Sequence, residues 1–112
     1  MRYAVPVTDG RIAAHFGHCE QFAMFDVDEA KKEIVRKELL HSPGHEPGLL
    51  PVWLAEEGAS VIIAGGMGSR AQSLFADNHI LVIIGAPEGD PQKAVLDHID
   101  DRLVTGNNIC DH

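Results

Sequence analysis

The chain has 112 residues, a formal net charge of −8, 45% hydrophobic residues and 23% charged residues. This length suits a single domain over residues 1–112 with one hydrophobic core, and the composition excludes a disordered tail. The nine basic residues are scattered, which excludes nucleic acid as the main partner because phosphate binding needs clustered Lys and Arg. The longest apolar run, Ile80 to Ile84, is too short to cross a membrane, and no signal-peptide pattern opens the sequence. We therefore expect a cytoplasmic protein.

The first forty residues carry three strand patterns. Residues 2–8 indicate a buried strand, which Asp9-Gly10 ends with a turn before an irregular loop over 9–20. Residues 21–28 alternate apolar with polar or small residues, and residues 32–40 are heavily charged. The last two segments predict a hairpin whose second strand lies at a sheet edge, where charges prevent unwanted pairing.

The rest of the chain alternates helices with short strands. Helices are expected over 48–57, from Ser69 and from Asp90-Pro91, and strands over 61–64 and 80–84. Ser69 and Gln72 have the spacing of a capping box. The order β-β-β-α-β-α-β-α, with right-handed crossovers, predicts a three-layer α/β/α fold around a five-stranded mixed sheet.

The expected strand directions bring several loops to one edge of this sheet. If only 21–28 runs against the other strands, the loops after the parallel strands all leave at the carboxyl edge, where open α/β sheets bind ligands. The metal-capable side chains predicted to be neighbours there are His15, His18, Cys19, His41 and His45.

The segment His15-Phe16-Gly17-His18-Cys19 is the densest of these groups, with three candidate ligands in five residues. Imidazole and thiolate together suit zinc, copper or metal–sulfur clusters. The chain lacks the Cys-x-x-Cys pair of a structural zinc site. The alternative is that the histidines only cap or fill the loop, which then holds no physiological metal.

The C-terminal residues Cys110 and His112 are further candidate ligands. Residues 102–112 span about 35 Å when extended, which is enough to return from the last helix to the carboxyl edge. The alternative is that this tail lies in solvent, as chain ends commonly do.

The run Gly65-Gly66-Met67-Gly68-Ser69-Arg70 joins a strand to a helix. Its backbone N–H groups can bind an anion, a metal–sulfur cluster included, and Arg70 adds positive charge. The run lacks the Gly-Lys-Ser/Thr of a phosphate-binding loop, which argues against a nucleotide. The alternative is a tight turn that needs glycine for its backbone conformation.

The sequence offers little for catalysis. It has no nucleophile elbow, no His-Glu-x-x-His helix and no carboxylate pair that belongs to one site. Cys19 beside His18 resembles an activated thiol, but adjacent side chains seldom point together. We expect a protein that is not an enzyme.

Several motifs in order resemble the dinitrogenase iron–molybdenum cofactor biosynthesis family, which includes NifX-like and NafY-like carriers and the C-terminal domain of NifB-like proteins. They are Ala4-Val5-Pro6-Val7, His15 to Phe22, Val61 to Ala71, and Thr105 to His112. The resemblance implies a ribonuclease-H-like motif and non-enzymatic carriage of an iron–molybdenum cofactor precursor. One relative holds a molybdenum–copper sulfide cluster.

The resemblance also implies partners, namely proteins that donate the metal cluster and proteins that accept it. A homodimer is compatible with the sequence. This chain lacks the radical-enzyme domain and cysteine triplet of NifB-like proteins, so we expect a carrier whose recipient need not be nitrogenase. The alternative is an interaction or regulatory module with no physiological metal.

Overall fold

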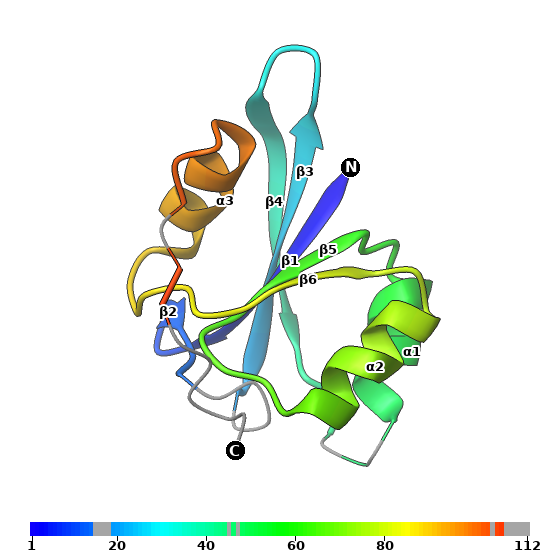
Figure 1. Ribbon diagram of the computed structural model, residues 1–112. Coiled ribbons are helices and arrows are strands. Elements are labelled where there is room, and N and C mark those ends of the chain that lie inside the picture. The colour runs from blue at the N-terminus through cyan, green and yellow to red at the C-terminus, as the bar shows by residue number, and fades with distance from the viewer. Residues whose placement is uncertain (15–18, 45, 47, 104, 107–112) are drawn as a thin grey trace.

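The computed structural model describes residues 1–14, 19–44, 46, 48–103 and 105–106. Within these residues a mixed sheet of six strands has the order β4-β3-β1-β5-β6, and β2 pairs with β1. The strands are β1 (Arg2–Thr8), β2 (Arg11–Ile12), β3 (Gln21–Asp28), β4 (Glu33–His41), β5 (Val61–Ile63) and β6 (Leu81–Ile83). The helices of this part of the chain are α1 (Leu49–Glu56), α2 (Ser69–Asp77) and α3 (Pro91–Ile99) (Figure 1).

The helices cover both faces of the sheet, with α1 and α2 on one side and α3 on the other (Figure 1). Leu54 of α1 and Phe75 of α2 belong to one buried cluster that includes Ala4 of β1. Val95 of α3 belongs to a second cluster, which includes Val5. Ala4 and Val5 point to opposite faces because side chains alternate along a strand. The result is the α/β/α layering that the sequence predicted. No helix in the described ranges has the length and apolar character that a membrane crossing requires.

The strand directions agree with the prediction. β3 is antiparallel to both β1 and β4, whereas β5 is parallel to β1 and β6 is parallel to β5. β1, β4, β5 and β6 therefore run in one direction. Their carboxyl ends meet at one edge of the sheet, called the carboxyl edge below, and the opposite edge is called the amino edge.

The prediction of five strands and an irregular loop over 9–20 is wrong, because β2 lies within that loop. Asp9 and Gly10 have φ angles of 54° and 79°. Positive φ at both central residues makes the tight turn that matches strand twist, so the chain reverses at once. Val7 then pairs with Ile12, and Thr8 pairs with Arg11.

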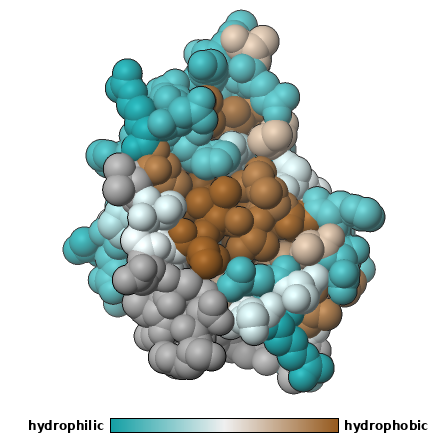
Figure 2. All heavy atoms as spheres, in the orientation of Figure 1, coloured by the Kyte–Doolittle hydropathy of each residue, from teal (hydrophilic) through white to brown (hydrophobic). Residues whose placement is uncertain are grey.

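The two lateral edges of the sheet differ in character. β4 carries four charged residues, Glu33, Arg36, Lys37 and Glu38, as predicted for an edge strand that must not pair with other chains. β6 consists of Leu81, Val82 and Ile83, and Leu81 is 57% exposed. Figure 2 shows a continuous apolar patch between α2 and α3, where Figure 1 draws β6.

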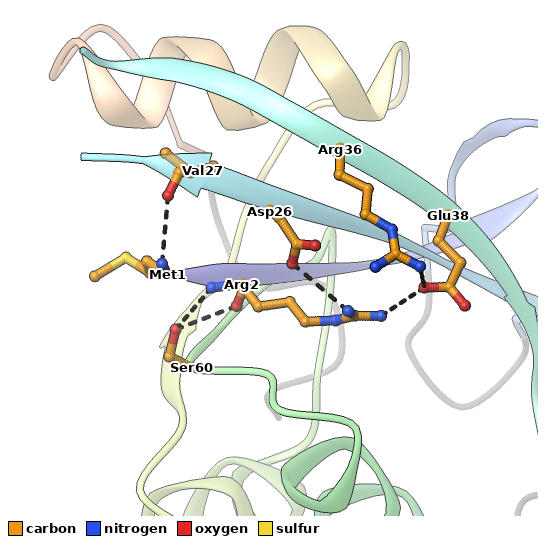
Figure 3. Close-up of polar contacts among 7 residues, drawn as sticks. All are labelled: Met1, Arg2, Asp26, Val27, Arg36, Glu38 and Ser60. Atoms are coloured by element: carbon orange, nitrogen blue, oxygen red, sulfur yellow. Dashed lines mark hydrogen bonds and ion pairs between the residues drawn. The ribbon is translucent and has the colours of Figure 1, made fainter. Parts of the chain in front are cut away.

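An ionic network ties the strands together near the amino edge (Figure 3). The Arg2 guanidinium donates to Glu38 at 2.9 Å and lies 3.5 Å from Asp26, so one side chain of β1 reaches both β3 and β4. Arg36 approaches the same Glu38 oxygen at 3.7 Å. On the other side of β1, the Ser60 hydroxyl bonds to the Arg2 backbone just before β5 begins. These contacts set the register at the end of the sheet that lies farthest from the carboxyl edge.

Tyr3 and His98 connect α3 to β1 at the same end of the sheet. The Tyr3 hydroxyl lies 2.8 Å from His98 Nδ1, and the two rings meet edge to face at 5.5 Å. Burial raises the pKa of the Tyr3 phenol, and the negative charge of Glu29 raises it further. The phenol therefore stays neutral and able to donate its proton to the imidazole.

Replacing Tyr3 by Phe keeps the ring packing and removes this hydrogen bond. We expect Tyr3→Phe to lower the free energy of unfolding by about 1 kcal/mol, the usual net value of one such bond. A double-mutant cycle with His98→Ala, measured by urea denaturation, should assign most of this loss to the pair. A coupling energy near zero would show that the hydrogen bond does not anchor α3.

Candidate functional site at the carboxyl edge

Loops that are distant in sequence meet at the carboxyl edge through backbone contacts. The Ser42 amide after β4 donates to the Glu20 carbonyl before β3 at 2.9 Å. The Gly85 amide after β6 donates to the Gly65 carbonyl after β5, also at 2.9 Å. These bonds place the exit of β4 beside the entry of β3 and the exit of β6 beside that of β5, as the predicted topology requires.

Gly65 allows the loop after β1 to lie directly against the loop after β5. A Cβ atom at this position would lie 2.9 Å from the Ala13 carbonyl oxygen and 3.1 Å from that of Ala14. Real Cβ atoms do not make contacts this short with backbone, so only glycine fits here. Ala14 is the residue that precedes the predicted metal-binding segment, which begins at His15. The structure therefore brings the entrance of that segment to the glycine turn.

Cys19 is fully buried beneath this junction, with no exposed surface. It belongs to the apolar cluster of α1 and α2, together with Ala13, Phe22, Ala64 and Met67. Burial raises the pKa of its thiol from 9.0 to about 12, because an apolar environment disfavours the thiolate, although a backbone hydrogen bond partly opposes the shift. In this arrangement the thiol is protonated at neutral pH. A metal ion that binds it has to displace the proton.

His41 is placed differently from Cys19. It is the exposed last residue of β4 and pairs with Gln21 of β3. Its neighbour Leu40 packs against the cluster that contains Cys19, so alternation along the strand directs His41 to the opposite face. The two residues share the carboxyl edge but not one face of the sheet.

The turn before α2 presents a free helix start. Gly65 and Gly66 are buried, whereas Ser69 and Arg70 are exposed. The first N–H groups of a helix have no intrahelical acceptor, and Gly68 at the N-cap position of α2 has no side chain to accept from them; among the described residues no side-chain cap is present. This arrangement suits an anion, since the helix dipole places partial positive charge at the same point.

The predicted capping box of Ser69 and Gln72 is wrong. Because Gly68 takes the N-cap position, Ser69 is the first residue of the helix. Gln72 Nε2 instead donates to the Met67 carbonyl at 2.9 Å. This bond joins the first turns of α2 to the loop before it. Gln72 therefore stabilises the glycine turn rather than capping the N-terminus of the helix. The helix start predicted at Asp90-Pro91 is confirmed, and the Asp90 carboxylate caps it by accepting the Gln92 amide at 2.9 Å.

Five of the predicted ligands lie outside the described residues. They are His15, His18, His45, Cys110 and His112. Among the residues that are described, no three His, Cys, Asp or Glu side chains are grouped to hold a metal ion. The metal-binding roles predicted for these residues, and for Cys19 and His41, stay predictions.

Two residues have places at this edge that the sequence pattern did not predict. Met67 is buried in the cluster that contains Cys19, although it stands in a turn of glycines. The sequence signal for this burial is a large apolar residue within a run of glycines, which indicates that the turn packs against the core. Gly106 donates its amide to the Gly85 carbonyl at 2.7 Å, so the chain after α3 returns to the carboxyl edge at least as far as this residue.

Two surface hollows lie away from Cys19 and the glycine turn. A groove of about 350 Å³ separates Pro91 of α3 from Leu39 of β4. A smaller hollow of about 240 Å³ surrounds Tyr3 and His98 near the amino edge. Neither is lined by Cys19 or by residues of the turn before α2, so we place the candidate site at the carboxyl edge from its contacts rather than from a cavity.

The fold and this edge define a class of small α/β proteins with a mixed sheet, an uncapped helix start and a buried thiol among converging loops. The family described as "Dinitrogenase iron-molybdenum cofactor" matches residues 1–101. The chain therefore belongs to the dinitrogenase iron–molybdenum cofactor family, as its motifs suggested.

Solved structures and a curated relative extend the comparison. The chain is similar to the crystal structure of PH0822, with a TM-score of 0.85 and 27% identity over 94% of each chain. It is similar to the apo form of the orange protein (ORP) from Desulfovibrio gigas, with a TM-score of 0.71 and 25% identity over 96% of this chain and 93% of that one. "Uncharacterized protein MJ0580" from Methanocaldococcus jannaschii is 31% identical over 80 residues, which cover 67% of this chain and 66% of that protein. The chain thus spans just under two thirds of this relative.

The raised pKa of Cys19 predicts a loss of stability at alkaline pH. The folded state holds the thiol proton up to about pH 12, whereas the unfolded chain releases it near pH 9. Stability from this group is therefore complete below pH 9 and decreases above it, by about 1 kcal/mol at pH 10. Urea denaturation between pH 8 and pH 10 measures the effect, and Cys19→Ala should remove this part of the pH dependence. Identical pH profiles for the two proteins would contradict the buried thiol.

Proposed function

We propose that this protein binds an anionic metal–sulfur cluster at the carboxyl edge and delivers it to a partner protein. The cluster is an iron–molybdenum cofactor precursor or a related species, consistent with the family to which the chain belongs. The observation that carries the proposal is the junction of Ala13 and Ala14 with Gly65, which brings the entrance of the 15–19 segment to the glycine turn.

The start of α2 supports an anionic cargo. The uncapped N–H groups and the exposed Arg70 offer hydrogen bonds and positive charge within one turn of helix. The whole chain carries a net charge of −8, so an anion needs a local donor group such as this helix start with Arg70. In this proposal Gly65, Gly66, Gly68 and Ser69 hold the sulfides through their backbone groups.

Soft ligands complete the proposed site. Cys19 and the histidines of its segment, His15 and His18, are the first candidates because the segment follows Ala14, which lies against Gly65. His41, His45, Cys110 and His112 are further candidates. A cluster brings its own sulfides, so few protein ligands are enough to hold it, and few ligands also permit its release to an acceptor. This chemistry favours a carrier rather than an enzyme.

Anaerobic loading tests the proposal. The purified chain is incubated with tetrathiomolybdate and copper(I), or with an iron–sulfur precursor, and then desalted. We expect charge-transfer absorption bands and bound metal and sulfide in fixed proportion to protein. Cys19→Ala and His15→Ala should lower the metal content by about tenfold or more, as loss of a ligand does.

His79→Asn is the matched control for these variants. His79 is exposed and follows α2 at the amino edge, with a φ of 62° that asparagine tolerates. It should load like the wild type. Equal loading of Cys19→Ala, His15→Ala and the control would exclude this site, and an absence of loading in every protein would favour an interaction module without metal.

A further inference from the structure

The two lateral edges of the sheet end in strands of opposite chemistry. β4 carries charged side chains along its nine residues, whereas residues 80–87, which contain β6, carry none. Charged side chains on an edge strand prevent it from pairing with another chain. β6 has no such protection, so the sheet can accept a further strand on this side only.

The outer side of β6 presents backbone hydrogen-bonding groups. The Leu81 amide donates to the Ser60 carbonyl at 2.9 Å. The Ile83 carbonyl accepts from the Ala64 amide at 2.8 Å, so Leu81 and Ile83 both direct backbone groups towards β5. Because these groups alternate sides along a strand, the N–H and C=O of Val82 point away from β5. Among the described residues, β6 is the last strand on this side of the sheet, and none of them adds a strand beyond it.

Apolar side chains surround these outward-directed groups. Leu81 is 57% exposed, and Val82, Ile83 and Ile84 are half-buried. Figure 2 shows them within a continuous apolar patch between α2 and α3, where Figure 1 draws β6. An apolar strand edge of this kind is a surface on which another chain can pair.

We propose that β6 pairs antiparallel with β6 of a second copy of this chain, which makes a symmetric homodimer with one continuous sheet. A two-fold axis at Val82 places this residue opposite its own copy. Each Val82 amide then donates to the Val82 carbonyl of the other copy. The same axis places Leu81 opposite Ile83 of the second copy, so the exposed Leu81 side chain gains an aliphatic neighbour on its own face of the sheet. The edge is thus complementary to itself, as a two-fold interface requires.

The charge of the chain favours this edge for contact between copies. Each copy carries a net charge of −8, so two copies repel one another over most of their surface. Residues 80–87 add no charge to the contact, whereas β4 would bring charged side chains together. Antiparallel pairing also places the two carboxyl edges at opposite ends of the joined sheet. The dimer therefore forms whether or not a cluster binds.

Sedimentation velocity from about 10 µM to 1 mM tests the dimer, since a small interface gives a weak affinity. We expect a reversible monomer–dimer equilibrium for the parent chain. Leu81→Lys should raise the dissociation constant by about a hundredfold or more, because the interface contains the substitution twice and buries both charges. A chain that stays monomeric at every concentration would overturn the proposal and leave the edge to a strand from a different protein.

Leu39→Lys is the matched control. Leu39 is 56% exposed and lies on β4, at the other lateral edge of the sheet. The two variants replace the same residue type at nearly equal exposure and change the net charge equally. Leu39→Lys should dimerise like the parent chain. Equal dissociation constants for the two variants, or a larger effect of Leu39→Lys, would overturn the proposal.

Amide hydrogen exchange of the parent chain locates the interface without any substitution, so it decides the question if urea denaturation shows that Leu81→Lys is unfolded. The Val82 amide should exchange about tenfold or more slowly at the dimer concentration than at the monomer concentration, because pairing covers it. The Ala64 amide bonds to Ile83 within one copy and should be protected at both concentrations. Protection that increases with concentration on β4 but not at Val82 would overturn the proposed interface.

Discussion

The carboxyl edge depends on the close approach of one backbone to another at Gly65 and Gly85. At both positions the neighbouring segment lies where a Cβ atom would otherwise be, so the loops after β1, β5 and β6 and the chain after α3 form one contact layer. The core beneath this layer is apolar and contains Cys19. A side chain at either glycine would push apart the two backbone segments that meet there.

Most of the fold could be predicted from residue patterns because its elements follow local rules. Alternation over 21–28, charges over 32–40 and the Asp90-Pro91 start of α3 each specify an element with little help from the rest of the chain. β2 was missed because its two residues carry no pattern of their own. The Asp9-Gly10 pair was the sign of it, since this dipeptide favours a two-residue hairpin turn rather than an open loop.

The site was less predictable because it depends on tertiary contacts. Sequence spacing placed Cys19 and His41 at one edge, which is correct, but it carried no information on burial or on the face that each side chain occupies. The burial of Cys19 arises from packing with Phe22 and Met67, which come from separate segments. The capping box predicted at Ser69 is absent because α2 already begins at Ser69, which leaves Gly68 at the N-cap position. The hydrogen bond from the Gly106 amide to the Gly85 carbonyl joins residues that are 21 positions apart, and no local pattern encodes it.

We propose that an anionic metal–sulfur cluster binds at the carboxyl edge. The most direct measurement is an amide NMR spectrum of the anaerobic chain before and after loading with tetrathiomolybdate and copper(I), a diamagnetic combination. Binding at this edge should shift the amide signals of Ala14, Cys19 and residues 65–70 and leave those of Ser60 and His79 at the amino edge unchanged. Shifts centred on Tyr3 and His98, or a spectrum that does not change on addition of the cluster components, would contradict it.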